Sequence, residues 1–183
     1  MNGYMPSMDV ELQKYQQKIE NNFHIIMKEL VVYLRNHESV WDGRELIETA
    51  DLLNRAKSLA IRKVENHLLR NKDRYYHYFE MREQQFELLE RMVPLISTLT
   101  YSVPQSEKIA DFLDHLSNHI HSGNTAQLFL QKLQKMRREM EQTDLPKTRE
   151  EFETRANLFY FLREMERYLI IKHQSQSNPP QVS

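Results

Sequence analysis

The sequence has no cysteine, only three glycines, and six prolines, two of which lie in the last five residues. Without cysteine there can be no disulfide, no thiol nucleophile and no cysteine-ligated zinc site. Three glycines are too few for a glycine-rich phosphate-binding loop, and no such motif is present. Because glycine and proline are the main turn residues, their scarcity, with abundant Glu, Gln, Lys, Leu, Met and Arg, favours an all-α protein.

A strong charge of either sign and a long apolar run are also lacking. The 25 basic and 26 acidic residues nearly cancel, which argues against general nucleic-acid binding. No apolar stretch approaches the roughly 20 residues that a membrane-spanning helix needs, so we expect the chain to be soluble as it stands. No catalytic or cofactor-binding motif is found either. We therefore expect neither an enzyme nor a bound cofactor.

Apolar residues recur at helical spacing in six segments of the chain. The spacing predicts four long helices at about 8–36, 44–71, 74–100 and 149–172, and a shorter helical hairpin at about 105–121 and 124–142. Short connections favour antiparallel neighbours. The expected architecture is an antiparallel bundle of the four long helices, with the hairpin inserted between the last two.

One domain, spanning residues 8–173, accounts for all six segments. Residues 1–7 contain Gly3 and Pro6 and are expected to lie outside the fold, as a disordered or foreign start. Residues 174–183 are polar and include Pro179 and Pro180. They have too little apolar surface to offset the entropy of ordering, so we predict a disordered tail.

The last predicted helix has the clearest start signal. Thr148 is a suitable N-cap, Glu151 stands three residues later as in a capping box, and Pro146 keeps the preceding chain out of the helix. Residues 158–162 are apolar on every side, which indicates that more than one neighbour covers this turn. The stripe predicted to face the core consists of Phe152, Ala156, Phe159, Leu162, Met165 and Leu169.

An arginine occupies a core position of the helix predicted at 74–100. Arg82 lies in the apolar stripe of that helix, among Tyr75, Tyr78 and Phe79. The favoured interpretation is core packing with an internal ion pair, because a lone buried charge is costly. The alternative is a pocket for an aromatic carboxylate, in which rings stack and the guanidinium binds the acid through two hydrogen bonds. The proposed acidic partners on the last helix are Glu150, Glu151, Glu153, Glu164 and Glu166.

Asp111, His115 and His119 form the best candidate for a metal site. Their spacing of four places all three on one face of the helix predicted at 105–121. The cluster is weak, because neither an HExxH motif nor paired Glu-x-x-His motifs accompany it. A solvated polar face beside the apolar stripe is the favoured interpretation, and no metal is expected.

Long word-like segments of the sequence resemble a known family. YYHYFEMREQQFELLERMVPLIS at 75–97, SEKIADFLDHLSNHIHSGNT at 106–125 and LPKTREEFETRANLFYFLREMERYL at 145–169 are similar to the C-terminal domain of the bacterial aromatic acid exporter family 1. The resemblance runs from about residue 9 to residue 173. It carries no established catalytic or ligand-binding residues onto this chain.

The resemblance implies a function as well as a fold. It implies the cytoplasmic domain of a membrane exporter of aromatic carboxylic acids, at the cytoplasmic face of the bacterial plasma membrane, with a role in assembly, gating or sensing. The implied partners are the protein's own N-terminal transmembrane domain, which this chain lacks, further copies of the chain, and an aromatic acid ligand. The alternative is a stand-alone helical ligand-binding or scaffold domain without transport function.

Overall fold

The computed structural model describes residues 6–67, 73–121, 123 and 125–177. Within these ranges it contains helices and turns but no strand, so the all-α prediction is confirmed. The helices are α1 (Pro6–Asn36), α2 (Arg44–His67), α3 (Asp73–Ser97), α4 (Pro104–Ser117), α5 (Ala126–Glu141) and α6 (Arg149–Ser177). No helix in the described ranges is long and apolar enough to cross a membrane.

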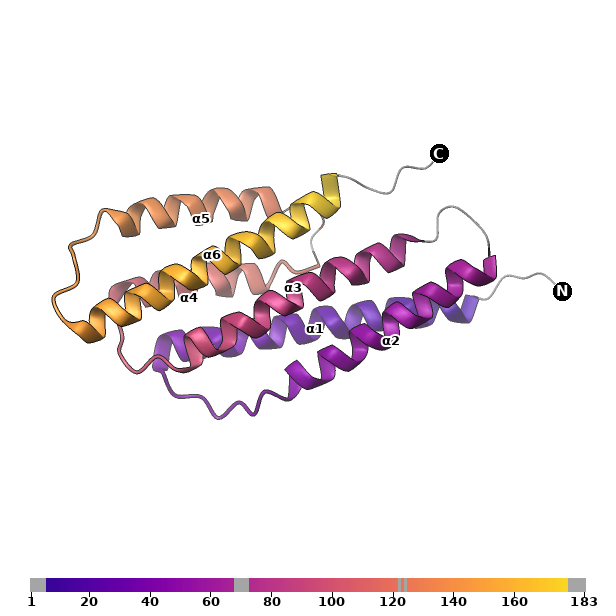
Figure 1. Cartoon of the computed structure of the whole chain (residues 1–183), viewed down its shortest axis with the longest axis horizontal. Helices are drawn as coiled ribbons and strands as arrows, with labels where there is room; N and C mark the ends of the chain where they lie inside the picture. The colour runs from indigo at the N-terminus through magenta and orange to yellow at the C-terminus, as the bar shows by residue number, and fades with distance from the viewer. Residues whose placement is uncertain (1–5, 68–72, 122, 124, 178–183) are drawn as a thin grey trace.

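The six helices form an elongated bundle in which two groups of three pack side by side (Figure 1). α1, α2 and α3 contact one another, and so do α4, α5 and α6. The two groups join where α1 packs on α4 and α3 packs on α6. The hairpin of α4 and α5 is inserted in the chain as predicted. The structure adds that α4 lies against α1 in the core, while α2 and α5 flank the bundle.

Several helix ends differ from the predicted positions. α3 ends at Ser97 and not near residue 100. Pro94 has no backbone N–H to donate within the helix, and the Thr98 hydroxyl donates to the Pro94 carbonyl at 2.6 Å. α4 ends at Ser117 and not at residue 121, because the Asn118 and His119 amides bond carbonyls three residues back, as in a tightened last turn.

The helices at the two ends of the chain extend a few residues beyond their predicted bounds. α1 begins at Pro6, within the stretch expected to lie outside the fold, because proline suits the first turn of a helix. α6 continues to Ser177, through the first residues of the predicted tail, since glutamine is a fair helix former and the first proline comes only at Pro179. Residues 1–5 and 178–183, and the predicted end of α2 at 68–71, lie outside the described residues.

The start signal of α6 is confirmed. The Glu151 amide donates to Thr148 Oγ1 at 3.1 Å, which is the predicted N-cap bond. The Glu151 carboxylate accepts a hydrogen bond from the backbone amide of Lys147 at 3.0 Å. In a standard capping box the donor would be the amide of the N-cap residue, one position later.

The predicted core stripe of α6 is wrong in its first half. Phe152 is 60% exposed, Ala156 is exposed and Phe159 is only partly buried. Leu158 and Phe161 are fully buried in their place, because α3 and α5 cover α6 from two sides and select a neighbouring face. The buried apolar residues of α6 are Leu158, Phe161, Leu162, Met165, Tyr168 and Leu169.

Candidate functional site

Arg82 lies in the centre of the bundle with only 2% of its surface exposed. It occupies the α3 stripe between Phe79 and Phe86, both of which are buried. Its guanidinium carbon is 5.4 Å from the centre of the Phe23 ring and 5.2 Å from that of Tyr78, within the range of cation–π contacts. The position predicted from helical spacing is therefore confirmed.

Four hydrogen bonds hold the Arg82 guanidinium. Nε donates to the Tyr78 hydroxyl at 2.9 Å, and Nη1 donates to Gln85 Oε1 at 2.9 Å. Nη2 donates to the Ile120 carbonyl at 3.0 Å and to Glu20 Oε1 at 3.3 Å. Since a buried guanidinium needs a partner for most of its donors, these contacts explain how α3 carries a charge into the core.

The acidic partner of Arg82 is Glu20 on α1, and not a glutamate of the last helix as predicted. Glu20 is 5% exposed, accepts hydrogen bonds from the Tyr78 hydroxyl and from Gln16, and also contacts His121 Nδ1. Of the predicted partners, Glu164 is also buried, but it pairs with Arg91 and Arg167. The prediction failed because α1 approaches this part of α3.

The aromatic residues predicted to bind a ligand with Arg82 lie along the same helix. Tyr78 contacts Arg82 directly, whereas Tyr75 and Phe79 are buried and stack with ring centres 6.3 Å apart. A ligand carboxylate at Arg82 would have to displace Glu20. Binding of an aromatic acid by these four residues stays a prediction.

The network continues from α3 to α6. Lys172 is 6% exposed and donates to the Ile120 carbonyl at 3.2 Å, so this one oxygen accepts from both Lys172 and Arg82. The side-chain Nε2 of Gln85 donates to the backbone carbonyl of Tyr168 at 3.1 Å. These bonds link α3, α6 and the turn after α4 through polar contacts inside the core.

Burial and neighbouring charges change the ionisation of this network. Burial alone would raise the pKa of Glu20, but the hydrogen bond from Tyr78 and the charge of Arg82 outweigh it and lower that pKa. Burial raises the pKa of Tyr168 to about 12. Burial and the nearby Arg82 lower the pKa of Lys172 from 10.5 to about 8. At neutral pH Arg82 and Lys172 are therefore cationic and Glu20 is anionic.

The candidate metal residues, on α4 and in the turn that follows it, have other partners. Asp111 binds Arg35 on α1 at 2.8 Å. His119 Nδ1 contacts the His115 carbonyl at 2.8 Å, and His115 Nδ1 lies 3.2 Å from Lys132 Nζ on α5. Across the part of the chain that the structure describes, no three His, Asp or Glu side chains are placed to hold a metal ion.

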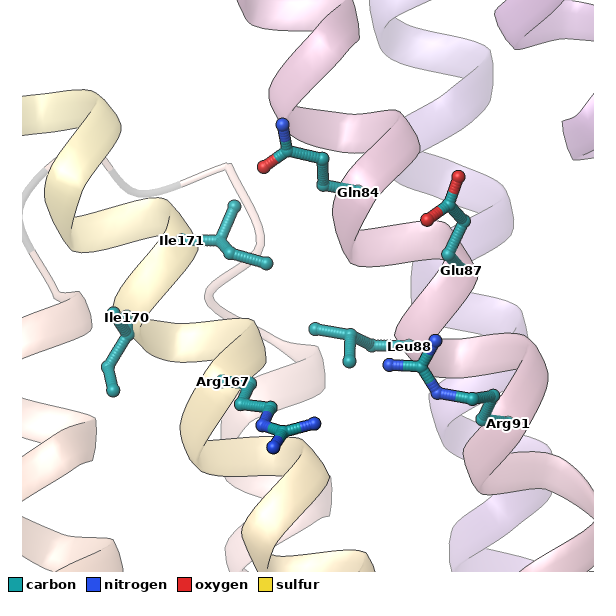
Figure 2. A pocket seen from close by; sticks show the side chains of 7 residues that line it. All are labelled: Gln84, Glu87, Leu88, Arg91, Arg167, Ile170 and Ile171. Carbon is teal, nitrogen blue, oxygen red and sulfur yellow. The ribbon is translucent and has the colours of Figure 1, made fainter.

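An open groove of about 350 Å³ lies between α3 and α6 (Figure 2). Sequence reasoning missed it, because its polar residues occupy exposed positions of α3 and α6, where charged side chains are usually just solvated. The groove residues recur at intervals of three or four positions within each helix, and this spacing does not indicate that the two helices pack against each other. The groove is lined by Gln84, Glu87, Leu88, Arg91, Arg167, Ile170 and Ile171.

Comparison with known proteins places this fold in context. A solved relative of the fold, the crystal structure of a putative membrane protein from Clostridium difficile 630, matches with a TM-score of 0.79 over 91% of this chain and 99% of that one. At 23% identity this likeness shows the fold alone.

A relative in sequence is the uncharacterized protein YqjA of Bacillus subtilis strain 168, which is 51% identical over 172 residues. The match covers 94% of this chain but 53% of the relative, so the chain spans about half the length of that protein. Residues 9–173 match the family described as the putative aromatic acid exporter C-terminal domain. This match takes in almost all of the described bundle, and the chain belongs to that family.

Proposed function

We propose that this chain is the cytoplasmic domain of a membrane exporter of aromatic carboxylic acids, and that it serves assembly, gating or sensing rather than catalysis. The observation that carries the proposal is the family match over residues 9–173, which covers the bundle from α1 into α6. The relative of about twice the length supports it, since a protein of that length has room for a further domain. The partner in this proposal is a membrane domain of the same protein.

The interior of the bundle supports a mechanical role rather than a permeation path. Arg82, Glu20 and Lys172 all have partners inside the domain, and their contacts join α1, α3 and α6. A domain stiffened in this way suits the transfer of a structural change to an attached partner. Assembly into a homo-oligomer belongs to the same proposal.

Efflux by the full gene product is the direct test. The full-length protein and a version lacking the segment that matches residues 9–173 would be expressed in a bacterial strain that accumulates 4-hydroxybenzoate. We expect both in the membrane fraction, with lower intracellular 4-hydroxybenzoate only for the full-length protein. Recovery of the full-length protein outside the membrane fraction would favour the alternative of a stand-alone scaffold or binding domain. Equal accumulation in all strains would refute export of this compound class.

A further inference from the structure

The groove between α3 and α6 has a cationic end built by two arginines that share one carboxylate. Arg91 donates to Glu164 Oε2 from Nε at 3.2 Å and from Nη2 at 3.0 Å, and Arg167 donates to Glu164 Oε1 from Nη1 at 3.3 Å. Glu164 is only 1% exposed, whereas the side chains of Arg91 and Arg167 are 52% and 58% exposed. Arg91 and Arg167 thus pair with the same buried carboxylate, and these three side chains together carry one net positive charge.

Both guanidiniums keep donors for a further anion. A guanidinium has five N–H donors. Arg167 uses Nη1 alone, and Arg91 uses Nε and Nη2, for hydrogen bonds within the part of the chain that the structure describes. Figure 2 shows the two guanidiniums reaching toward the space between the helices, one from each side. Because Glu164 fixes both side chains, the remaining donors are held in place for a second carboxylate.

The middle of the groove is apolar. Leu88 is buried, Ile170 and Ile171 are half-buried, and Figure 2 shows Leu88 and Ile171 pointing toward each other across the groove. A bound group that contacts them would bury apolar surface, which stabilises the complex. The volume of about 350 Å³ is at the lower end of that of small-molecule sites, so the occupant must be small.

Along α3, away from the arginines, the groove carries Glu87 about one turn from Arg91 and Gln84 about two turns from it. At a rise of about 1.5 Å per residue, these lie roughly 6 Å and 10 Å along α3 from Arg91. The negative charge of Glu87 disfavours a second anionic group there, and both side chains can accept a hydrogen bond from a hydroxyl. The groove therefore fits a small molecule with a carboxylate at one end, an apolar body and a hydroxyl at the other end.

From this arrangement we infer that the groove binds a small aromatic monocarboxylate of the hydroxybenzoate type. Its carboxylate lies between Arg91 and Arg167, and its ring lies on Leu88 and Ile171. The choice of an aromatic rather than an aliphatic body rests on the proposed function; the carboxylate and the single charge follow from the groove itself.

Methyl-resolved NMR of the 183-residue chain tests the site with 4-hydroxybenzoate as the probe. For a ligand of this size we expect a Kd on the order of 0.1 to 1 mM. The methyl signals of Leu88, Ile170 and Ile171 should shift on titration, while that of the exposed Ile47 on α2 should not. 4-Hydroxybenzamide, which has the same shape without the charge, should bind at least about tenfold more weakly.

Two substitutions and a matched control separate the site from the fold. Arg167→Gln and Arg91→Gln each remove one guanidinium from the groove, and each should weaken binding about tenfold. Arg137→Gln removes an arginine outside the groove that pairs with Glu166 at 2.7 Å, and it should leave the affinity unchanged. The melting temperature of each variant, measured without ligand, reports any effect on folding.

Three results would overturn the inference. One is an absence of methyl shifts at about 10 mM probe, well above the expected Kd; another is equal affinity of the Arg167→Gln and Arg137→Gln variants. The third is a set of shifts centred on residues around Arg82. Each leaves the efflux test untouched, because export by the full-length protein does not require this groove. Conversely, binding in the groove without any efflux would refute the proposed function alone.

Discussion

Arg82 on α3 and Glu20 on α1 form an ion pair at 3.3 Å in the middle of the bundle, with side chains only 2% and 6% exposed. The two residues are 62 positions apart in the chain. Removing one member of such a pair leaves an uncompensated buried charge, whereas apolar replacement of both can be almost neutral. The pair is therefore better tested by a double-mutant cycle than by one substitution.

Glu20→Leu should lower the free energy of unfolding by about 3 to 5 kcal/mol, because Arg82 keeps its charge without its anion. The double variant Glu20→Leu/Arg82→Met should be more stable than Glu20→Leu, since the orphaned charge is gone. Urea denaturation of the wild type, both single variants and the double variant measures this coupling. Strictly additive losses would show that the two side chains do not interact.

Lys172 makes a prediction about alkaline pH. Its pKa is about 8 in the folded chain and near 10.5 in the unfolded chain, so between these values the unfolded chain binds more protons. Below pH 8 the buried ammonium group of Lys172 therefore lowers the free energy of unfolding by its full amount. As the pH rises above 8 this loss is relieved, and the free energy of unfolding increases. At about 1.4 kcal/mol per pKa unit, the upper bound of the gain is about 3 kcal/mol.

Lys172→Met isolates this effect. Tyr168, whose pKa is raised to about 12, acts in the opposite direction above pH 10, so the comparison is best made between pH 7 and 9.5. The difference in unfolding free energy between wild type and Lys172→Met should change by about 1 to 2 kcal/mol across that range. A difference independent of pH would mean that Lys172 titrates normally.

The corrected core face of α6 is tested with two phenylalanines two positions apart. Phe161 is fully buried, so Phe161→Ala should cost about 3 to 5 kcal/mol. Phe159 is only partly buried, so Phe159→Ala should cost clearly less. Chemical denaturation of both variants ranks the two positions, and the reverse order would restore the face predicted from the sequence.

The N-cap of α6 gives a smaller effect. Thr148→Ala removes the acceptor of the Glu151 amide and should cost about 1 kcal/mol. Thr148→Ser keeps the acceptor and serves as the control. If both variants unfold at the wild-type denaturant concentration, the cap contributes nothing to the stability of the domain.

Features that depend on one helix were predictable from the sequence, and features that depend on two were not. Thr148 and the stripe containing Arg82 are local signals, because capping and helical spacing are set within a few residues. Glu20 is flanked by Ile19 and Asn21, and nothing in that stretch marks it as the partner of a residue on another helix. Its choice over Glu164 follows from how α1 packs on α3.

The face of α6 and the groove were missed for the same reason. Where a helix turn is apolar all round, the phase of its core side is decided by the neighbours, so Phe161 and Phe159 could not be ranked from spacing. Arg91 and Arg167 each resemble an ordinary surface arginine in the sequence. Only the packing of α3 on α6 brings them to one carboxylate.

The carbonyl of Ile120 accepts from Arg82 on α3 and from Lys172 on α6 at 3.0 and 3.2 Å. It belongs to the turn that follows α4, so one oxygen ties together segments from both three-helix groups. If α6 slid along α3 by one helical turn, about 5.4 Å, it would have to release this oxygen and leave a buried ammonium group without it. A displacement of α6 should therefore move α3 with it, because the two helices resist sliding along each other.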